Sequence, residues 1–298
     1  MTESEQYTEF GRERYLEQLP DFIRNYGLLI PGLVFMGIFF LIPLVLIFIF
    51  TFYINPQGIA LYRPGFTLNH YIRFLNSTFY QQKVILTLKY GAAVTAMDML
   101  LGYPLAYFIA RTTPWKRRIL ILSLLSVLYV TYVIRAYSWT VILTTNGLVY
   151  NLMQALGLEP IVLYPGPWSV VIGLTYSLYP LFVLTLYSSM SNIPRELEEA
   201  SMNLGASRLK TFYNIVLPLS KNGAMAGAMI VFVLTIGSFI HPTILGSPSE
   251  YFISVYIEQL AVVQFNVPFA SVLSLVLLVI VLAIIAVISH FIDFREVT

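Results

Sequence analysis

The chain has 298 residues, of which 58% are hydrophobic and only 11% are charged, and its mean hydropathy is +0.76. Soluble domains carry about 25% charged residues, so the composition excludes an ordinary water-soluble protein, and its hydrophobicity excludes a disordered chain. The net charge of +2 gives no electrostatic reason to expect nucleic-acid binding, and the absence of cysteine excludes disulfides, thiolate metal sites and a cysteine nucleophile. The composition is therefore that of an integral membrane protein.

The first 26 residues are polar and carry six acidic residues against three arginines. They lack the basic start and short apolar core of a cleaved signal peptide. We expect residues 1–26 to form a retained cytoplasmic leader, which is either an amphipathic helix against the membrane or a partner, or a solvated tail.

Six apolar segments are long enough to cross a bilayer, whose core of about 30 Å requires about 20 helical residues. They cover residues 27–53, 84–110, 119–143, 168–190, 222–245 and 269–292. The sequence therefore predicts an all-α integral membrane protein with six transmembrane helices in one domain, residues 27–298.

The basic residues give the orientation, since cytoplasmic loops retain positive charge. Twelve of the 17 Lys and Arg residues lie before the first span, in the second and fourth loops, or after the sixth span, and three lie in the first outer loop. The two other outer loops, residues 144–167 and 246–268, contain none. Both termini are expected in the cytoplasm.

The long cytoplasmic loop, residues 191–221, has the composition of folded helix. Pro194 suits a first helical turn, and a mildly apolar face follows at i, i+3, i+4 and i+7, formed by Leu197, Ala200, Ser201 and Leu204. Gly205 can supply the left-handed residue that ends this helix, and Ser207 can cap a second helix that Pro218 stops. The loop is predicted to be a helical hairpin, which either docks into a groove of a partner or packs on its own bundle.

The same loop resembles the permease subunits of binding-protein-dependent ABC importers. Their pattern E-A-A-x3-G-x9-I-x-L-P is matched in register, with serine for the second alanine, by Glu199, Ala200, Ser201, Gly205, Ile215, Leu217 and Pro218. The resemblance implies a type I ABC importer permease fold, in which this hairpin, together with the neighbouring Glu198, is the coupling element that seats in a cytoplasmic ATPase.

The resemblance extends along most of the chain and is strongest to spermidine/putrescine permeases. The segments that carry it are LGYPLAYFIAR (101–111), IRAYSW (134–139), TTNGLVYNLMQALGL (144–158), YSLYPLFVLTLYSSM (176–190) and VPFASVLSL (267–275). It implies import of a polyamine or a related cationic solute. Related permeases for iron, sulfate, thiamine and opines share much of this pattern, so these solutes stay open as alternatives.

Motifs for nucleotide binding and hydrolysis are absent. The chain has no G-x-x-x-x-G-K-[ST], H-E-x-x-H or G-x-S-x-G, and its three histidines, His70, His241 and His290, are far apart in sequence. We therefore expect no enzyme activity, metal or cofactor in this chain, with ATP and Mg²⁺ bound by a partner ATPase.

Three ionisable residues fall within the expected spans, and charges there are costly enough to suggest a function for each. Lys89 can reach the outer interface. Asp98 lies about 18 Å and Arg135 about 24 Å from the cytoplasmic ends of consecutive antiparallel spans, which predicts a buried ion pair. This pair either fixes the helix register, or Asp98 faces the pathway and neutralises an amine while Arg135 belongs to an outer gate.

Aromatic and acidic residues extend this candidate pathway. Several rings cluster on the third and fourth spans, among them Tyr132, Trp139, Tyr176 and Tyr179. They could hold alkylammonium groups by cation–π contact, although Tyr and Trp also collect at membrane interfaces. Glu159, Glu250 and Glu258 lie in outer loops without Lys or Arg, and would attract cations and repel sulfate.

The predicted assembly is half of a transmembrane pathway in a bacterial inner membrane. Its expected partners are an ABC ATPase dimer, a second permease that forms a heterodimer with this chain, an extracytoplasmic substrate-binding protein and the lipid bilayer, with no nucleic acid. The alternative from another class is a self-contained secondary transporter, for which inverted repeats would be expected, and none is seen.

Overall fold

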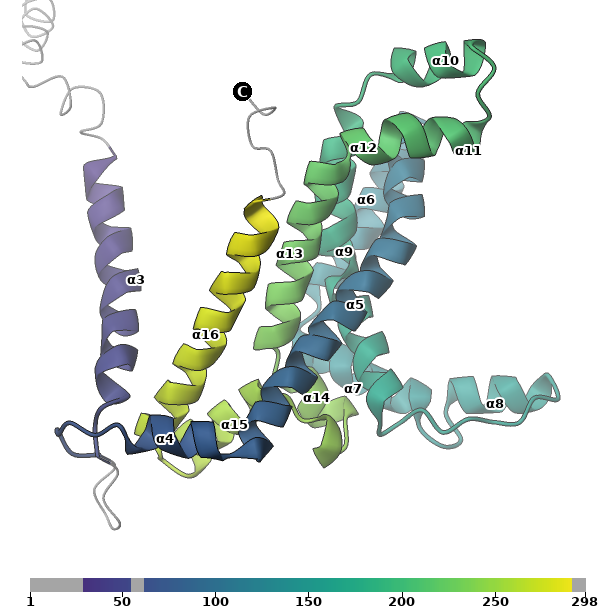
Figure 1. Ribbon diagram of the computed structural model, residues 1–298. Coiled ribbons are helices and arrows are strands. Elements are labelled where there is room, and N and C mark those ends of the chain that lie inside the picture. Colours follow the sequence, from purple (N-terminus) through teal and green to yellow (C-terminus); the bar gives the residue numbers. More distant parts are fainter. Residues whose placement is uncertain (1–28, 55–61, 291–298) are drawn as a thin grey trace, which may run out of the picture.

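A computed structural model describes residues 29–54 and 62–290, so the predicted leader lies outside the described residues. Within these residues the chain is helical, and extended backbone pairs only in an isolated bridge between Ile54 and Arg63. Figure 1 shows the helices as a bundle with a hairpin projecting beyond one end and short helices gathered at the other. The predicted all-α class is confirmed.

Four of the predicted spans are single helices. They are α3 (Ile30–Phe50), α5 (Thr78–Arg111), α9 (Pro167–Ser191) and α16 (Val267–His290). Their length and predominantly apolar sequence favour helix, because a helix satisfies its own backbone hydrogen bonds where no water is present. α5 begins six residues before the predicted span.

α3 exposes apolar side chains on all sides and packs mainly on α16.

The predicted third span, 119–143, is not one helix. α6 (Pro114–Tyr129) ends at Val130 and α7 (Tyr132–Leu143) begins after Thr131, both of which have extended backbone. The Thr131 side chain accepts a hydrogen bond from the Ile134 N–H and so caps α7. The segment Tyr132–Ala155, which contains α7 and α8 (Leu148–Ala155), is inclined at 98° to α6. This break invalidates the depth assigned to Arg135 from a straight helix.

The predicted fifth span, 222–245, is also interrupted. α13 (Lys221–Gly237) ends where Ser238 becomes extended, and the short α14 (Ile240–Leu245) follows. The structure has up to six candidate spans, the predicted number, if two bent helix pairs each count as one span: α6 with residues 132–155, and residues 208–219 with α13.

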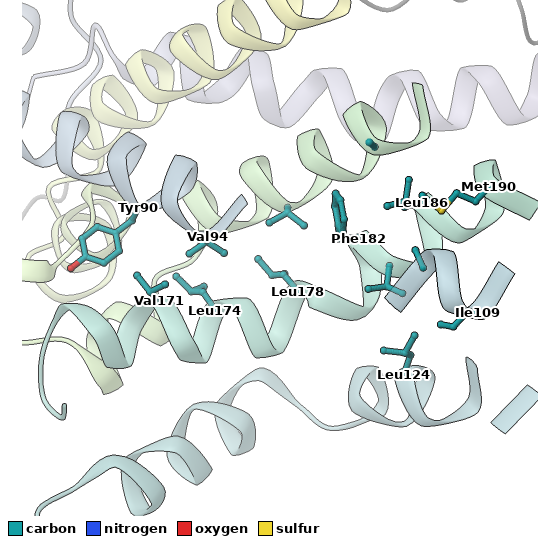
Figure 2. Close-up of a cluster of buried hydrophobic side chains, with 14 of the residues drawn as sticks. Tyr90, Val94, Ile109, Leu124, Val171, Leu174, Leu178, Phe182, Leu186 and Met190 are labelled. Carbon is teal, nitrogen blue, oxygen red and sulfur yellow. The ribbon is translucent and has the colours of Figure 1, made fainter. Parts of the chain in front are cut away.

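The core of the bundle is formed by α5, α9 and α13. Phe182 of α9 is fully buried, and it fits because two neighbouring positions are glycine. A Cβ on Gly102 of α5 would lie 2.4 Å from the Phe182 ring, and one on Gly227 of α13 would lie 3.0 Å from it. Figure 2 shows this cluster, with side chains of α9 directed into the space shared with α5.

The end of the bundle opposite the hairpin carries α4 (Asn69–Asn76), α7, α8, α14, η2 (Pro248–Glu250), α15 (Ile253–Glu258) and η3 (Gln259–Val263) (Figure 1). Lys83 of α5 donates to the carbonyl oxygens of Pro248 (3.1 Å) and Ser249 (2.9 Å). This buried ammonium therefore fastens the η2 loop to the bundle.

Candidate functional site

The loop 191–221 forms the predicted hairpin, which we call the coupling hairpin. It consists of α10 (Arg195–Asn203), α11 (Arg208–Thr211), η1 (Phe212–Val216) and α12 (Leu217–Leu219). Gly205 has φ +91°, and the Ser207 side chain accepts from the Lys210 N–H, which confirms the predicted end of one helix and cap of the next. The Ser201 and Thr211 hydroxyls share a hydrogen bond of 3.0 Å that ties the two arms together.

Pro218 does not stop the second arm, which corrects the predicted helix end. A π-helical turn, η1, directly precedes it, and helix continues through Leu219. Proline lacks an N–H and its ring crowds the preceding turn, and a widened turn relieves both problems. The axis then bends by 67° into α13, between Leu219 and Lys221. Pro218 therefore lies near the corner that joins the coupling hairpin to the bundle.

The predicted apolar face of α10 is largely open to its surroundings. Leu197 is 44% and Leu204 is 90% exposed, and Ala200 is also exposed, whereas Ser201 faces the second arm. Of the other pattern residues, Glu199 and Pro218 are exposed, and Ile215 and Leu217 are half-buried. The exposed face is available to a partner.

Glu198 is directed inward, toward the bundle, and is only 7% exposed. It accepts hydrogen bonds from the Tyr107 hydroxyl (2.7 Å) and the Arg111 Nε (2.6 Å), and forms an ion pair with Arg111. Arg111 also donates to the Ile193 carbonyl oxygen at 3.2 Å. Glu198 therefore joins the coupling hairpin to the C-terminal end of α5, a role that its place in the sequence did not reveal.

A cavity of about 1070 Å³ lies between α5 and the coupling hairpin. Tyr103, Tyr107 and Phe212 form an aromatic part of its wall, and exposed charged residues, Arg195 and Glu199 among them, also line it. Movement of the hairpin relative to α5 would change the shape of this cavity.

The predicted ion pair between Asp98 and Arg135 does not form. Arg135 is 3% exposed, donates to the Ser177 carbonyl oxygen at 2.8 Å and lies 4.3 Å over the Tyr132 ring. Asp98 is fully buried, and neither of its carboxylate oxygens has a hydrogen-bond partner. The break between α6 and α7 explains the difference, since it places Arg135 on a helix inclined to the one assumed.

A polar network surrounds Arg135 instead. His241 of α14 shares hydrogen bonds with the Ser177 hydroxyl (2.9 Å) and the Ser238 hydroxyl (3.2 Å), and its ring meets that of Tyr132 edge to face. The network joins α7, α9 and α14 at the two helix breaks. Sequence analysis missed His241, because the only signal was one histidine in an apolar segment.

The other predicted pathway residues divide into two groups. Trp139 and Tyr176 pack edge to face at 5.5 Å, and the Tyr179 hydroxyl donates to the Leu101 carbonyl oxygen at 2.9 Å, so these three lie where α5, α7 and α9 meet. Glu258 ends α15, which packs mainly on α16. The structure therefore does not gather all of these residues into one site.

Glu250 is held by hydrogen bonds within its own loop. Burial alone would raise the pKa of Glu250, but hydrogen bonds from Ser247 and Ser249 outweigh that effect and hold the pKa below its ordinary value. Lys83 lies close enough to interact with it electrostatically, so Glu250 is not without a cation as its loop sequence suggested. In residues 29–54 and 62–290, no group of three His, Asp or Glu side chains could hold a metal ion.

Comparison with known proteins gives consistent matches. Residues 102–294 match the family described as binding-protein-dependent transport system inner membrane component. The spermidine/putrescine transport system permease protein PotB of Escherichia coli K12 is 34% identical over 211 residues, covering 70% of this chain and 76% of that protein. The inner membrane ABC transporter permease protein YdcU of the same organism is 31% identical over 270 residues, covering 85% of each.

A solved structure shows the same fold. A chain of the bacterial alginate ABC transporter, in complex with alginate pentasaccharide-bound periplasmic protein, superposes with a TM-score of 0.65 at 18% identity. The match covers 95% of this chain and 96% of that one. The predicted type I importer permease architecture is thereby confirmed.

Proposed function

Because this chain belongs to the family of binding-protein-dependent transport system inner membrane components, and so is a permease subunit of an ABC importer, we propose that its substrate is a polyamine such as spermidine or putrescine. The observation that carries this proposal is the 34% identity to a spermidine/putrescine permease over 211 residues. Family membership decides against a self-contained secondary transporter. It also assigns ATP hydrolysis to a separate subunit.

The coupling hairpin is the element through which that ATPase acts. Its exposed face, Leu197, Ala200 and Leu204, would seat in the ATPase, while Glu198 and Arg111 transmit displacement of α10 to α5. Nucleotide can shift the conformation of the permease only if the ATPase binds the hairpin differently in its two states. The hairpin side is then cytoplasmic, together with both termini, in line with the distribution of basic residues.

The remaining partners follow from this assignment. The outer end, with α4, α8 and α15, would receive the substrate-binding protein. A second, different permease would complete the pathway. The exposed apolar side chains of α3 would contact lipid or that subunit. The acids of the outer loops favour a cationic solute over sulfate or another anion.

The test is co-expression of the chain with the permease, ATPase and binding protein encoded with it, followed by purification in mild detergent. We expect one complex that imports radiolabelled putrescine or spermidine into proteoliposomes when ATP is supplied on the hairpin side. An ATPase subunit that cannot hydrolyse ATP is the matched control. Import of iron, thiamine, an opine or sulfate without polyamine import would overturn the substrate assignment, and recovery of a homodimeric permease would overturn the heterodimer.

A further inference from the structure

A second cavity, of about 440 Å³, lies where α5, α7 and α9 meet. Four aromatic rings line it, those of Trp139, Trp168, Tyr176 and Tyr179. The hydrogen bond from the Tyr179 hydroxyl to the Leu101 carbonyl oxygen holds one ring against α5, and the contact of Trp139 with Tyr176 orients two others. No charged side chain of the described residues lines this cavity, which we call the aromatic cavity.

Two unsatisfied polar groups stand at one wall of the aromatic cavity. Thr175 lines it, is 9% exposed, and its hydroxyl has no hydrogen-bond partner. The side chain of Thr175 faces that of Asp98 on α5, which is fully buried and whose two oxygens are also without a partner. Asp98 thus lies behind the Thr175 hydroxyl, outside the lining of the cavity.

Such an arrangement is unfavourable unless a ligand completes it. A buried polar group without a hydrogen bond costs free energy, and a buried carboxylate requires a compensating cation. The nearest internal candidate, Arg135, is engaged with Ser177 and Tyr132. A cation from outside the described part of the chain would supply the charge that Asp98 lacks as a partner.

An alkylammonium group fits each of these features. Its charge favours the faces of aromatic rings, its N–H donates to a hydroxyl, and its alkyl chain fits apolar walls. A threonine hydroxyl can accept one hydrogen bond and donate another, so Thr175 can link a bound ammonium to the Asp98 carboxylate. Sulfate or another anion would be repelled by the Asp98 carboxylate and would find no cationic side chain in the lining.

We propose that the aromatic cavity is an amine-binding subsite of the transport pathway, in which Thr175 bonds the ammonium, Asp98 balances its charge, and Trp139, Tyr176 and Tyr179 surround it. This deepens the proposed function and rests on it. Arg135 and Glu258 are not part of the subsite.

The experiment measures binding of radiolabelled putrescine to the purified complete complex, without the binding protein, and import of putrescine into proteoliposomes. Asp98→Asn and Thr175→Val should each weaken binding by about 10-fold or more, the loss typical for a hydrogen bond to a charged group. Thr175→Ser keeps the hydroxyl and should bind within about 2-fold of the unmodified complex. If only the shape of the Thr175 side chain mattered, valine, which has the same shape, would be the milder substitution and serine the more harmful one.

The matched control is Thr185→Val on the same helix, because the Thr185 hydroxyl already donates to the Leu181 carbonyl oxygen of its own helix. The amount of assembled complex is measured for every variant, and Thr175→Val keeps the test valid if Asp98→Asn assembles poorly. Unchanged putrescine binding and import by both variants would overturn the subsite alone. Failure of the unmodified complex to import any polyamine would overturn the proposed substrate, and the subsite with it.

Discussion

Replacing Glu198 by glutamine should loosen the coupling hairpin from α5. Breaking a buried ion pair by removing one charge costs about 3–5 kcal/mol. The side chains of Arg111 and Glu198 retain 16% and 9% exposure, which favours the lower end, about 3 kcal/mol. Since each 1.4 kcal/mol is a factor of ten, docking of α10 on α5 should weaken by roughly 100-fold.

The assay is the number of substrate molecules imported per ATP hydrolysed by the reconstituted complex. We expect this ratio to fall in Glu198→Gln while ATP hydrolysis continues, because the ATPase then moves a hairpin that no longer carries α5 with it. Glu196→Gln is the control, since Glu196 is an exposed acid of the same helix and surface substitutions usually change stability by less than about 0.5 kcal/mol.

A double-mutant cycle makes the reasoning refutable. Tyr107→Phe removes one hydrogen bond to Glu198 and should reduce the import ratio alone, yet have little further effect in Glu198→Leu, in which no acceptor for that hydrogen bond remains. Additive effects of the two substitutions, or an unchanged ratio in Glu198→Gln, would show that this pair does not transmit motion.

Three further substitutions test other parts of the structure. Gly205→Val places a β-branched residue at φ +91°, at a cost of about 1–3 kcal/mol, and should abolish import while membrane insertion stays normal; normal import would refute the coupling role. Gly102→Ala should lower the melting temperature of the purified complex, because its Cβ would meet Phe182, whereas Gly37→Ala, with no atom within 4 Å, should not. The pKa of Glu250 is lower in the folded protein than in an unfolded chain. The ionised Glu250 therefore stabilises the η2 loop at pH values above its ordinary pKa, and this stabilisation is lost as the pH falls through the lowered pKa. The protection factors of residues 246–251 against hydrogen exchange, each taken relative to the intrinsic exchange rate at that pH, should therefore fall in acid, and Glu250→Gln should remove that dependence.

Local signals in the sequence predicted the coupling hairpin in detail. Gly205 and Ser207 act through their own backbone conformation or hydrogen bond, so residue type and spacing were sufficient. The spans were predicted in number, because hydropathy measures the surrounding solvent and needs no knowledge of packing.

Features that depend on two helices at once could not be predicted in this way. The break after Tyr129 lies inside continuous apolar sequence that carries no Pro or Gly at that point. Hydropathy averaged over a window of residues therefore gives no sign of it. The expected Asp98–Arg135 pair failed for the same reason. The proximity of Thr175 to Asp98, and the hydrogen bond between His241 and Ser177, depend on helix rotations that hydropathy does not specify.

The two broken helices also bear on how the membrane fits around the protein. α6 has 16 residues and α13 has 17, so each is only about 24–26 Å long, shorter than the roughly 30 Å of hydrocarbon that a single span must cross. The non-helical backbone at Val130–Thr131 and Ser238–Phe239 therefore falls within bilayer depth, where lipid cannot hydrogen-bond it. Protein or water must therefore surround both breaks. We infer that both face the interior of the transporter and not the lipid acyl chains.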